Sequence, residues 1–179
     1  TATASPGYVF TNWSGNGIAD ENATATTISL TSDLNVTVNF ESLTYPLNLS
    51  AEPSGGGTVV GSGRYVLGSS VNIVALPTTG YQFIGWIGGN PADANNSATI
   101  VTVTGSADIR AEFEKLQYNV SIAVSPVGAA TVSGGGTYQH GDTVSLVSTP
   151  IKGYEFSHWS GANWTDTNSS DQSFTVSGD

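Results

Sequence analysis

The sequence contains no cysteine, which excludes disulfide bonds, thiolate metal sites and cysteine nucleophiles. Basic residues are also scarce: lysine and arginine together number 4, against 14 aspartates and glutamates, so the formal net charge is -10. A chain this acidic repels nucleic-acid phosphates and anionic lipid headgroups. No apolar run approaches the roughly 18 residues of a membrane span. We therefore expect neither nucleic-acid binding nor direct membrane insertion.

Groups for acid–base chemistry are equally few. The chain has 2 histidines, His140 and His158, and the positions that correspond to them in the repeats described below carry other residue types. Neither has an evident nucleophile and orienting acid beside it, as a Ser-His-Asp site requires. No pair of carboxylates stands out for glycoside hydrolysis. The expectation is a protein that is not an enzyme, with no catalytic residue and no resident cofactor.

What the chain does contain is a repeat. The phrase Gly-Tyr-x-Phe-x-x-Trp begins at Gly7, at Gly80 and at Gly153, and the sequence aligns with itself without a gap when it is shifted by 73 positions. A match of this density indicates tandem duplication. Because an active site is normally built once in a domain, a phrase that occurs three times favours architecture, or a surface presented several times.

The repeat divides the chain into about two and a half units. Residues 1–44 form the back half of one unit, residues 45–117 a complete unit, and residues 118–179 a unit without its last strand. If the last strand of one unit folds with the next unit, the boundaries become 33–105 and 106–178. The joint EFEKLQYNVS has neither glycine nor proline, so the strands are expected to run nearly continuously there.

Each unit is predicted to be all β. Apolar and polar residues alternate with a period of two, and Gly, Pro and Asn interrupt the pattern every 8–12 residues, which is typical of short antiparallel strands. Units that contact mainly their neighbours through short linkers would form a tandem, rod-like array. In the complete unit the six predicted segments are 45–53, 57–66, 70–77, 80–89, 98–105 and 108–115, and the glycines within the second segment indicate a bend or bulge.

The aromatic residues of the repeated phrase raise a question of geometry. Tyr81 and Phe83 lie two positions apart and share one face of a strand, whereas Trp86 falls on the other face. Either the strand bends before the tryptophan, or both faces carry a large aromatic side chain. A unit of this size buries only about 60% of its unfolded surface, so we expect these side chains mostly in the core.

The polar loop after the phrase carries the candidate binding residues. An Asp-x-Asn pattern recurs there, and its aspartates are Asp20, Asp93 and Asp166. An aspartate in this setting favours an Asx-turn, in which the side chain bonds nearby backbone. The alternative is a calcium site, since hard cations take several oxygen ligands from flexible loops.

The same loop offers two further candidates. Asn22, Asn95 and Asn168 each open an N-x-[ST] sequon, and they are the candidate N-glycosylation sites. Trp164, flanked by Asn163 and Asp166, stands where the other units have Ile18 and Pro91, so the repeat does not require it. A loop tryptophan beside polar side chains is the arrangement of a carbohydrate site, although it also fits packing at a junction between modules.

The glycine spacing and the aromatic phrase together resemble a known family. The pattern P-x-x-G-G…G-x-Y…G-x-x-V-x-(I/L)-x-x-x-P-x-x-G-Y-x-F-x-x-W-x-G is similar to the divergent internalin-type B-repeat, also called the Listeria–Bacteroides or bacterial repeat domain. The resemblance spans the whole chain and implies small modules that are β-grasp-like or small sandwiches. Some members carry a cysteine pair in the loop after the tryptophan, where this chain has Asn, Asp and Ser.

The resemblance also implies a function. Family members are extracellular or cell-surface proteins in which the repeats serve as stalks or adhesion modules, and they are not known as enzymes. The expected role is a non-catalytic stalk, spacer or assembly element. Its partners would be other domains of the same protein or neighbouring copies, with glycans as a possible addition. The alternative is a carbohydrate- or ligand-binding accessory module that uses the loop aromatic and Asn/Asp residues.

Overall fold

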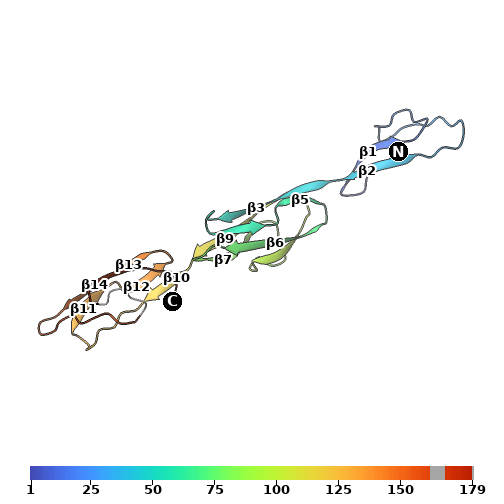
Figure 1. Ribbon diagram of the computed structural model, residues 1–179. Coiled ribbons are helices and arrows are strands. Elements are labelled where there is room, and N and C mark those ends of the chain that lie inside the picture. Colours follow the sequence, from blue (N-terminus) through green and yellow to red (C-terminus); the bar gives the residue numbers. More distant parts are fainter. Residues whose placement is uncertain (162–167, 179) are drawn as a thin grey trace. The chain divides into compact units, whose positions relative to one another are not determined.

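The computed structural model describes residues 1–161 and 168–178, which fold entirely as β-strands, turns and loops (Figure 1). These residues contain no helix, and so none with the length and apolar character needed to cross a membrane. The prediction of an all-β chain is confirmed. Two compact units are present: residues 1–76 with 83–112, and residues 77–82 with 113–179.

The middle repeat consists of two sheets. The four-stranded sheet has the order β5-β3-β9-β7, and the three-stranded sheet has the order β4-β6-β8. Alternate residues of both sheets are buried, among them Leu47, Ile73 and Ile109, so the two inner faces form the core. The strands are β3 (Thr44–Glu52), β4 (Gly57–Val60), β5 (Gly63–Val66), β6 (Ser70–Pro77), β7 (Tyr81–Ile87), β8 (Ala98–Thr102) and β9 (Ala107–Lys115).

One pairing differs from the predicted antiparallel arrangement. β3 and β9 are parallel, in a register that runs from Leu47 opposite Ala107 to Glu52 opposite Glu112. The antiparallel prediction was wrong for this pair because alternation reports which side chains are buried and carries no information on strand direction. The first and last strands of the span 45–117 are therefore neighbours in one sheet.

The predicted bend in the second segment is present as a break between β4 and β5. Gly61 lies there with a φ of 120°, a conformation that disfavours any side chain. The Tyr65 hydroxyl donates a hydrogen bond of 3.0 Å to the Gly61 carbonyl oxygen. The same bond, also 3.0 Å, joins Tyr138 to Gly134 in the next repeat. The Gly-x-Gly-x-Tyr spacing thus allows the tyrosine hydroxyl to donate a hydrogen bond across the bend to the carbonyl oxygen of the first glycine.

The aromatic side chains of the repeated phrase lie together because the strand is irregular. The pairing of β1 (Tyr8–Ser14) with β2 (Thr37–Ser42) shifts register between Phe10 and Asn12. This bulge returns Trp13 to the side of Phe10, and the two ring centroids are 5.9 Å apart. The corresponding distance is 5.6 Å for Phe83 and Trp86. Of the two alternatives, the bend before the tryptophan is the observed one.

The N-terminal half repeat contains only a small part of this architecture. β1 and β2 form a two-stranded antiparallel sheet, and an isolated bridge joins Ile18 to Ile28. Val38 and Phe40 remain 37% and 39% exposed. Two strands bury little apolar surface, so this segment has less core to hold it than the middle repeat.

The described residues of the C-terminal repeat form five short strands in two sheets. β10 pairs with β12, and the other sheet has the order β11-β13-β14. Val144, Leu146, Trp159 and Val176 form its buried cluster. The strands are β10 (Gln117–Val120), β11 (Ala130–Ser133), β12 (Gly136–Gln139), β13 (Thr143–Pro150) and β14 (Asp171–Thr175).

The joints between repeats are one residue long. Only Leu43 separates β2 from β3, and only Leu116 separates β9 from β10. The amide of Leu43 donates to the Gly7 carbonyl at 2.7 Å, and the amide of Leu116 donates to the Gly80 carbonyl at 2.9 Å. Each joint is therefore hydrogen-bonded to the glycine that opens the aromatic phrase. The one-residue gap at Leu116 agrees with the nearly continuous strands predicted from EFEKLQYNVS.

Candidate functional site

The Asp-x-Asn loops at Asp20 and Asp93 form Asx-turns. The Asp20 carboxylate accepts a hydrogen bond of 2.9 Å from the Asn22 amide, and the Asp93 carboxylate accepts one of the same length from the Asn95 amide. The amide of Asp93 in turn donates to the Thr99 hydroxyl at 3.0 Å. These bonds fold the loop locally. Calcium binding by Asp20 and Asp93 stays a prediction, and the described residues hold no group of three or more His, Asp or Glu side chains.

A second bond ties each of these loops to the core. The indole nitrogen of Trp13 donates to the Ala23 carbonyl at 2.8 Å, and that of Trp86 donates to the Asn96 carbonyl at 3.0 Å. The two acceptors are equivalent positions of the repeat. Trp159 is the third tryptophan of the series, and its indole nitrogen is buried without a hydrogen-bond partner among the described residues. This hydrogen bond from the indole to the loop is thus present in two repeats, and the Trp159 indole does not form it in the described part of the C-terminal repeat.

The other loop candidates differ in what the structure says of them. Asn22, Asn95 and Asn168 are all exposed, so a glycan at any of these sequons would meet solvent. Asn163, Trp164 and Asp166, the candidate carbohydrate and third calcium residues, lie outside the described residues. Glycosylation and sugar binding at these positions remain predictions.

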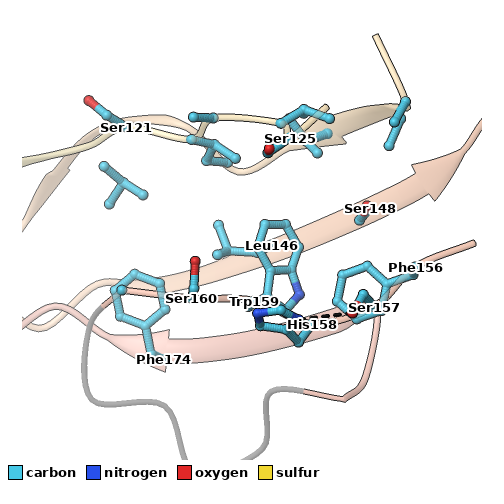
Figure 2. A pocket seen from close by; sticks show the side chains of 18 of the residues that line it. Ser121, Ser125, Leu146, Ser148, Phe156, Ser157, His158, Trp159, Ser160 and Phe174 are labelled. Atoms are coloured by element: carbon cyan, nitrogen blue, oxygen red, sulfur yellow. Dashed lines mark hydrogen bonds between the residues drawn. The ribbon is translucent and has the colours of Figure 1, made fainter. Parts of the chain in front are cut away.

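The C-terminal repeat contains a groove with a volume of about 920 Å³. Its two sides are residues 118–125 and residues 155–161, and β13 contributes Leu146 and Ser148 to its floor. Figure 2 shows the Trp159 indole in the space between the segment with Ser121 and Ser125 and the segment with Ser157 and Ser160. No motif in the sequence marks this groove, because it arises from how strands pair.

The groove occupies the place that β9 fills in the middle repeat. Shifting by 73 positions matches residues 121–125 to the half of β3 that pairs with β9, and matches 154–160 to β7, the other neighbour of β9. Neither 121–125 nor 154–160 is a strand in the structure, although their counterparts in the middle repeat are.

A glycine that recurs in all three repeats also has different surroundings in the C-terminal repeat. A Cβ atom at Gly15 would lie 2.6 Å from the Asn35 carbonyl oxygen, and one at Gly88 would lie 2.6 Å from the Asp108 carbonyl oxygen. Both oxygens belong to the sixth segment of their repeat. At Gly161, the third member of the series, no described atom outside its immediate chain neighbours lies within 4 Å. At Gly15 and Gly88 the absence of a side chain permits the close approach of the sixth segment.

The groove also carries a contact between a hydroxyl and an imidazole. Ser157 Oγ and His158 Nδ1 are 2.9 Å apart, and both residues are exposed (Figure 2). A hydrolytic serine needs its histidine oriented by a third group. The hydrogen bonds of the described residues give His158 no carboxylate partner. His140, the other histidine, packs beside Tyr118 with a centroid distance of 6.3 Å.

Comparison with known sequences gives one match. The sequence profile of the family described as Divergent InlB B-repeat domain matches residues 1–44, 47–117 and 120–179. Searches of curated proteins and of solved structures found no match. The three matched stretches together cover nearly the whole chain, and they follow the 73-residue period of the sequence.

Proposed function

The chain belongs to the divergent InlB B-repeat family, whose domains are typically repeat modules of bacterial surface proteins and generally non-catalytic. From this premise we propose that the chain is a tension-bearing spacer in an extracellular or cell-surface protein. Its task is to hold other domains, or neighbouring copies, at a distance while resisting unfolding under pull. The observation that carries the proposal is the parallel pairing of β3 with β9.

The geometry of this pair determines how tension acts on the repeat. The chain enters through the N-terminal end of β3 and leaves through the C-terminal end of β9. Because the strands are parallel, these two points lie at opposite ends of the pair, and a pull on them slides one strand along the other. All the hydrogen bonds of the six paired positions are then loaded together. Separating the same strands from one end would break them one after another.

The one-residue joints support the same role. Leu43 passes directly into β3 and Leu116 follows β9, so tension reaches the β3–β9 pair without first extending a loose linker. The acidic surface, with a net charge of -10, opposes nonspecific association of a protein displayed outside the cell.

Single-molecule pulling tests this proposal with two proline variants. In β3 the N–H of Leu49 donates to Ser62 on the β5 side, so the N–H of Ser50, the next residue, faces β9. Ser50 has an exposed side chain, and Ser50→Pro therefore removes a donor of the β3–β9 ladder while leaving the core filled. We expect the unfolding force of the middle repeat to fall sharply. Each released residue should still add about 3.3–3.6 Å of contour length.

The matched control is Asn72→Pro, which changes an exposed residue of β6 whose backbone faces β4, in the other sheet of the same repeat. This variant should lower thermal stability to a similar degree while leaving the unfolding force close to that of the unchanged protein. An equal drop of force in both variants would contradict the proposal, since strength would then follow overall stability and not the β3–β9 pair.

The alternative function, carbohydrate binding through Trp164, Asn163 and Asp166, has a separate test. Affinity electrophoresis in gels containing polysaccharides would show retardation that Trp164→Ala abolishes if this loop binds sugars. If the chain is only a spacer, no polysaccharide should retard it.

A further inference from the structure

The chain carries more N-x-[ST] sequons than its composition accounts for. Of its 13 asparagines, 8 are followed two positions later by serine or threonine, with no proline between. Serine and threonine make up 45 of the 179 residues, so chance would place one there for about 3 of the asparagines. One set recurs with the repeat: NAT, NNS and NSS stand at 22–24, 95–97 and 168–170. The middle residue changes each time, whereas the asparagine and the hydroxyl are kept.

In the loop sequons, the two groups that define a sequon have no structural use. Asn95 is exposed in a turn, and among the described residues neither its side-chain amide nor the Ser97 hydroxyl forms a hydrogen bond. The same holds for Asn22, also exposed, and for the Thr24 hydroxyl. The turn itself is made by Asp93, whose carboxylate accepts from the backbone N–H of Asn95. Folding of the described residues therefore does not explain why this position is asparagine.

Two sequons that lie in strands have their amides engaged. Asn48 lies in β3 opposite Asp108 of β9, and its Nδ2 donates to the Asp108 carboxylate at 2.8 Å. Asn119 lies in β10, and its Nδ2 donates at 3.0 Å to the hydroxyl of Ser121, the last residue of its own sequon. A ladder partner and a hydrogen bond thus hold the acceptor nitrogen of these two sequons, in contrast to the loop sequons.

We propose that Asn95 and its counterpart Asn22 carry N-linked glycans, and that the strand sequons at Asn48 and Asn119 stay unmodified. The donor is an oligosaccharide on a polyisoprenyl pyrophosphate. Its transfer forms a bond between the asparagine Nδ2 and C1 of the first sugar, breaks the bond from C1 to the pyrophosphate oxygen, and releases one amide proton to water. An exposed loop presents the amide and the sequon hydroxyl together to the transferase. The glycans would cover loops of the spacer, and their attachment does not depend on the β3–β9 pair.

Mass spectrometry of the protein purified from its native source tests this proposal. Because lysine and arginine are so few, trypsin places Asn95 and Asn119 in separate peptides, 65–110 and 116–152, each with no other sequon. Electron-transfer fragmentation, which keeps sugars on their side chains, identifies the modified residue. Peptide 65–110 should gain the mass of one glycan on Asn95, and peptide 116–152 should keep its unmodified mass. An unmodified peptide 65–110, or a glycan on Asn119, would overturn the proposal.

Variants produced in the same source identify the attachment point. Asn95→Gln should abolish the glycan of peptide 65–110, whereas Asn72→Gln, the same change at an exposed asparagine outside any sequon, should retain it. Ser97→Ala removes only the sequon hydroxyl and should also abolish the glycan, and Ser97→Thr should keep it. A glycan that survives Asn95→Gln or Ser97→Ala would overturn the assignment, because the sugar would then be attached through another group.

Discussion

Replacing Trp86 with alanine is expected to destabilise the middle repeat by about 3–5 kcal/mol. The side chain is 3% exposed, lies 5.6 Å from Phe83 between ring centroids, and anchors its loop by donating to the Asn96 carbonyl. Its removal opens a cavity and frees the loop at once. Because small domains hold only about 5–15 kcal/mol of stability in total, most of this repeat's stability would be lost.

Native-state hydrogen exchange followed by mass spectrometry measures this effect within one molecule. Peptides from β6 and β7 should exchange much faster in Trp86→Ala, while peptides from β13 and β14 serve as the internal reference. The control is Trp13→Ala, which removes the equivalent side chain where it is only half-buried. Its effect should be clearly smaller. Equal effects of the two substitutions would show that burial does not govern the role of the repeated tryptophan.

Replacing Ile109 with aspartate is expected to unfold the middle repeat. Ile109 is 1% exposed at the centre of β9, between β3 and β7. A carboxylate there loses its water without gaining a cation, since the basic residue next to it, Arg110, has an exposed side chain that forms an ion pair with Glu112 at 2.7 Å. The desolvation cost of several kcal/mol, added to the lost apolar contacts, exceeds what a repeat of this size can sustain.

The control for this prediction makes the same chemical change on an outer face. Ile100 in β8 is 46% exposed, so Ile100→Asp alters the net charge equally while burying nothing. We expect its effect on stability to stay within about 0.5 kcal/mol, as for most surface substitutions. Chemical denaturation monitored by tryptophan fluorescence compares the two variants. A folded, cooperative Ile109→Asp protein would contradict the placement of β9 in the core.

The repeat register and the strands follow from the sequence because both depend on local patterns. Alternation located β3, β6 and β9, and the glycines marked the break at Gly61. The Asx-turn at Asp93 was one of the two interpretations of a pattern that needs only neighbouring residues. These features involve interactions over a few positions, which a single sequence carries directly.

The remaining features depend on contacts between distant segments. The parallel direction of β9 beside β3 joins residues 60 positions apart, and no local pattern records strand direction. The groove was not predicted for the same reason: residues 121–125 and 154–160 keep their strand-like sequence, yet they are not strands in the structure. Whether a segment forms a strand depends on the strand that lies beside it, and the sequence of the segment does not encode that strand.

The measurement that tests the spacer role most directly compares two directions of pull on the same repeat. Because the chain has no cysteine, pairs of introduced cysteines give unique attachment points. Thr44→Cys with Lys115→Cys loads β3 and β9 in shear, whereas Thr44→Cys with Ser106→Cys pulls their adjacent N-terminal ends apart. The predicted result is a markedly higher unfolding force in shear. Equal forces in the two directions would contradict a tension-bearing role for the β3–β9 pair.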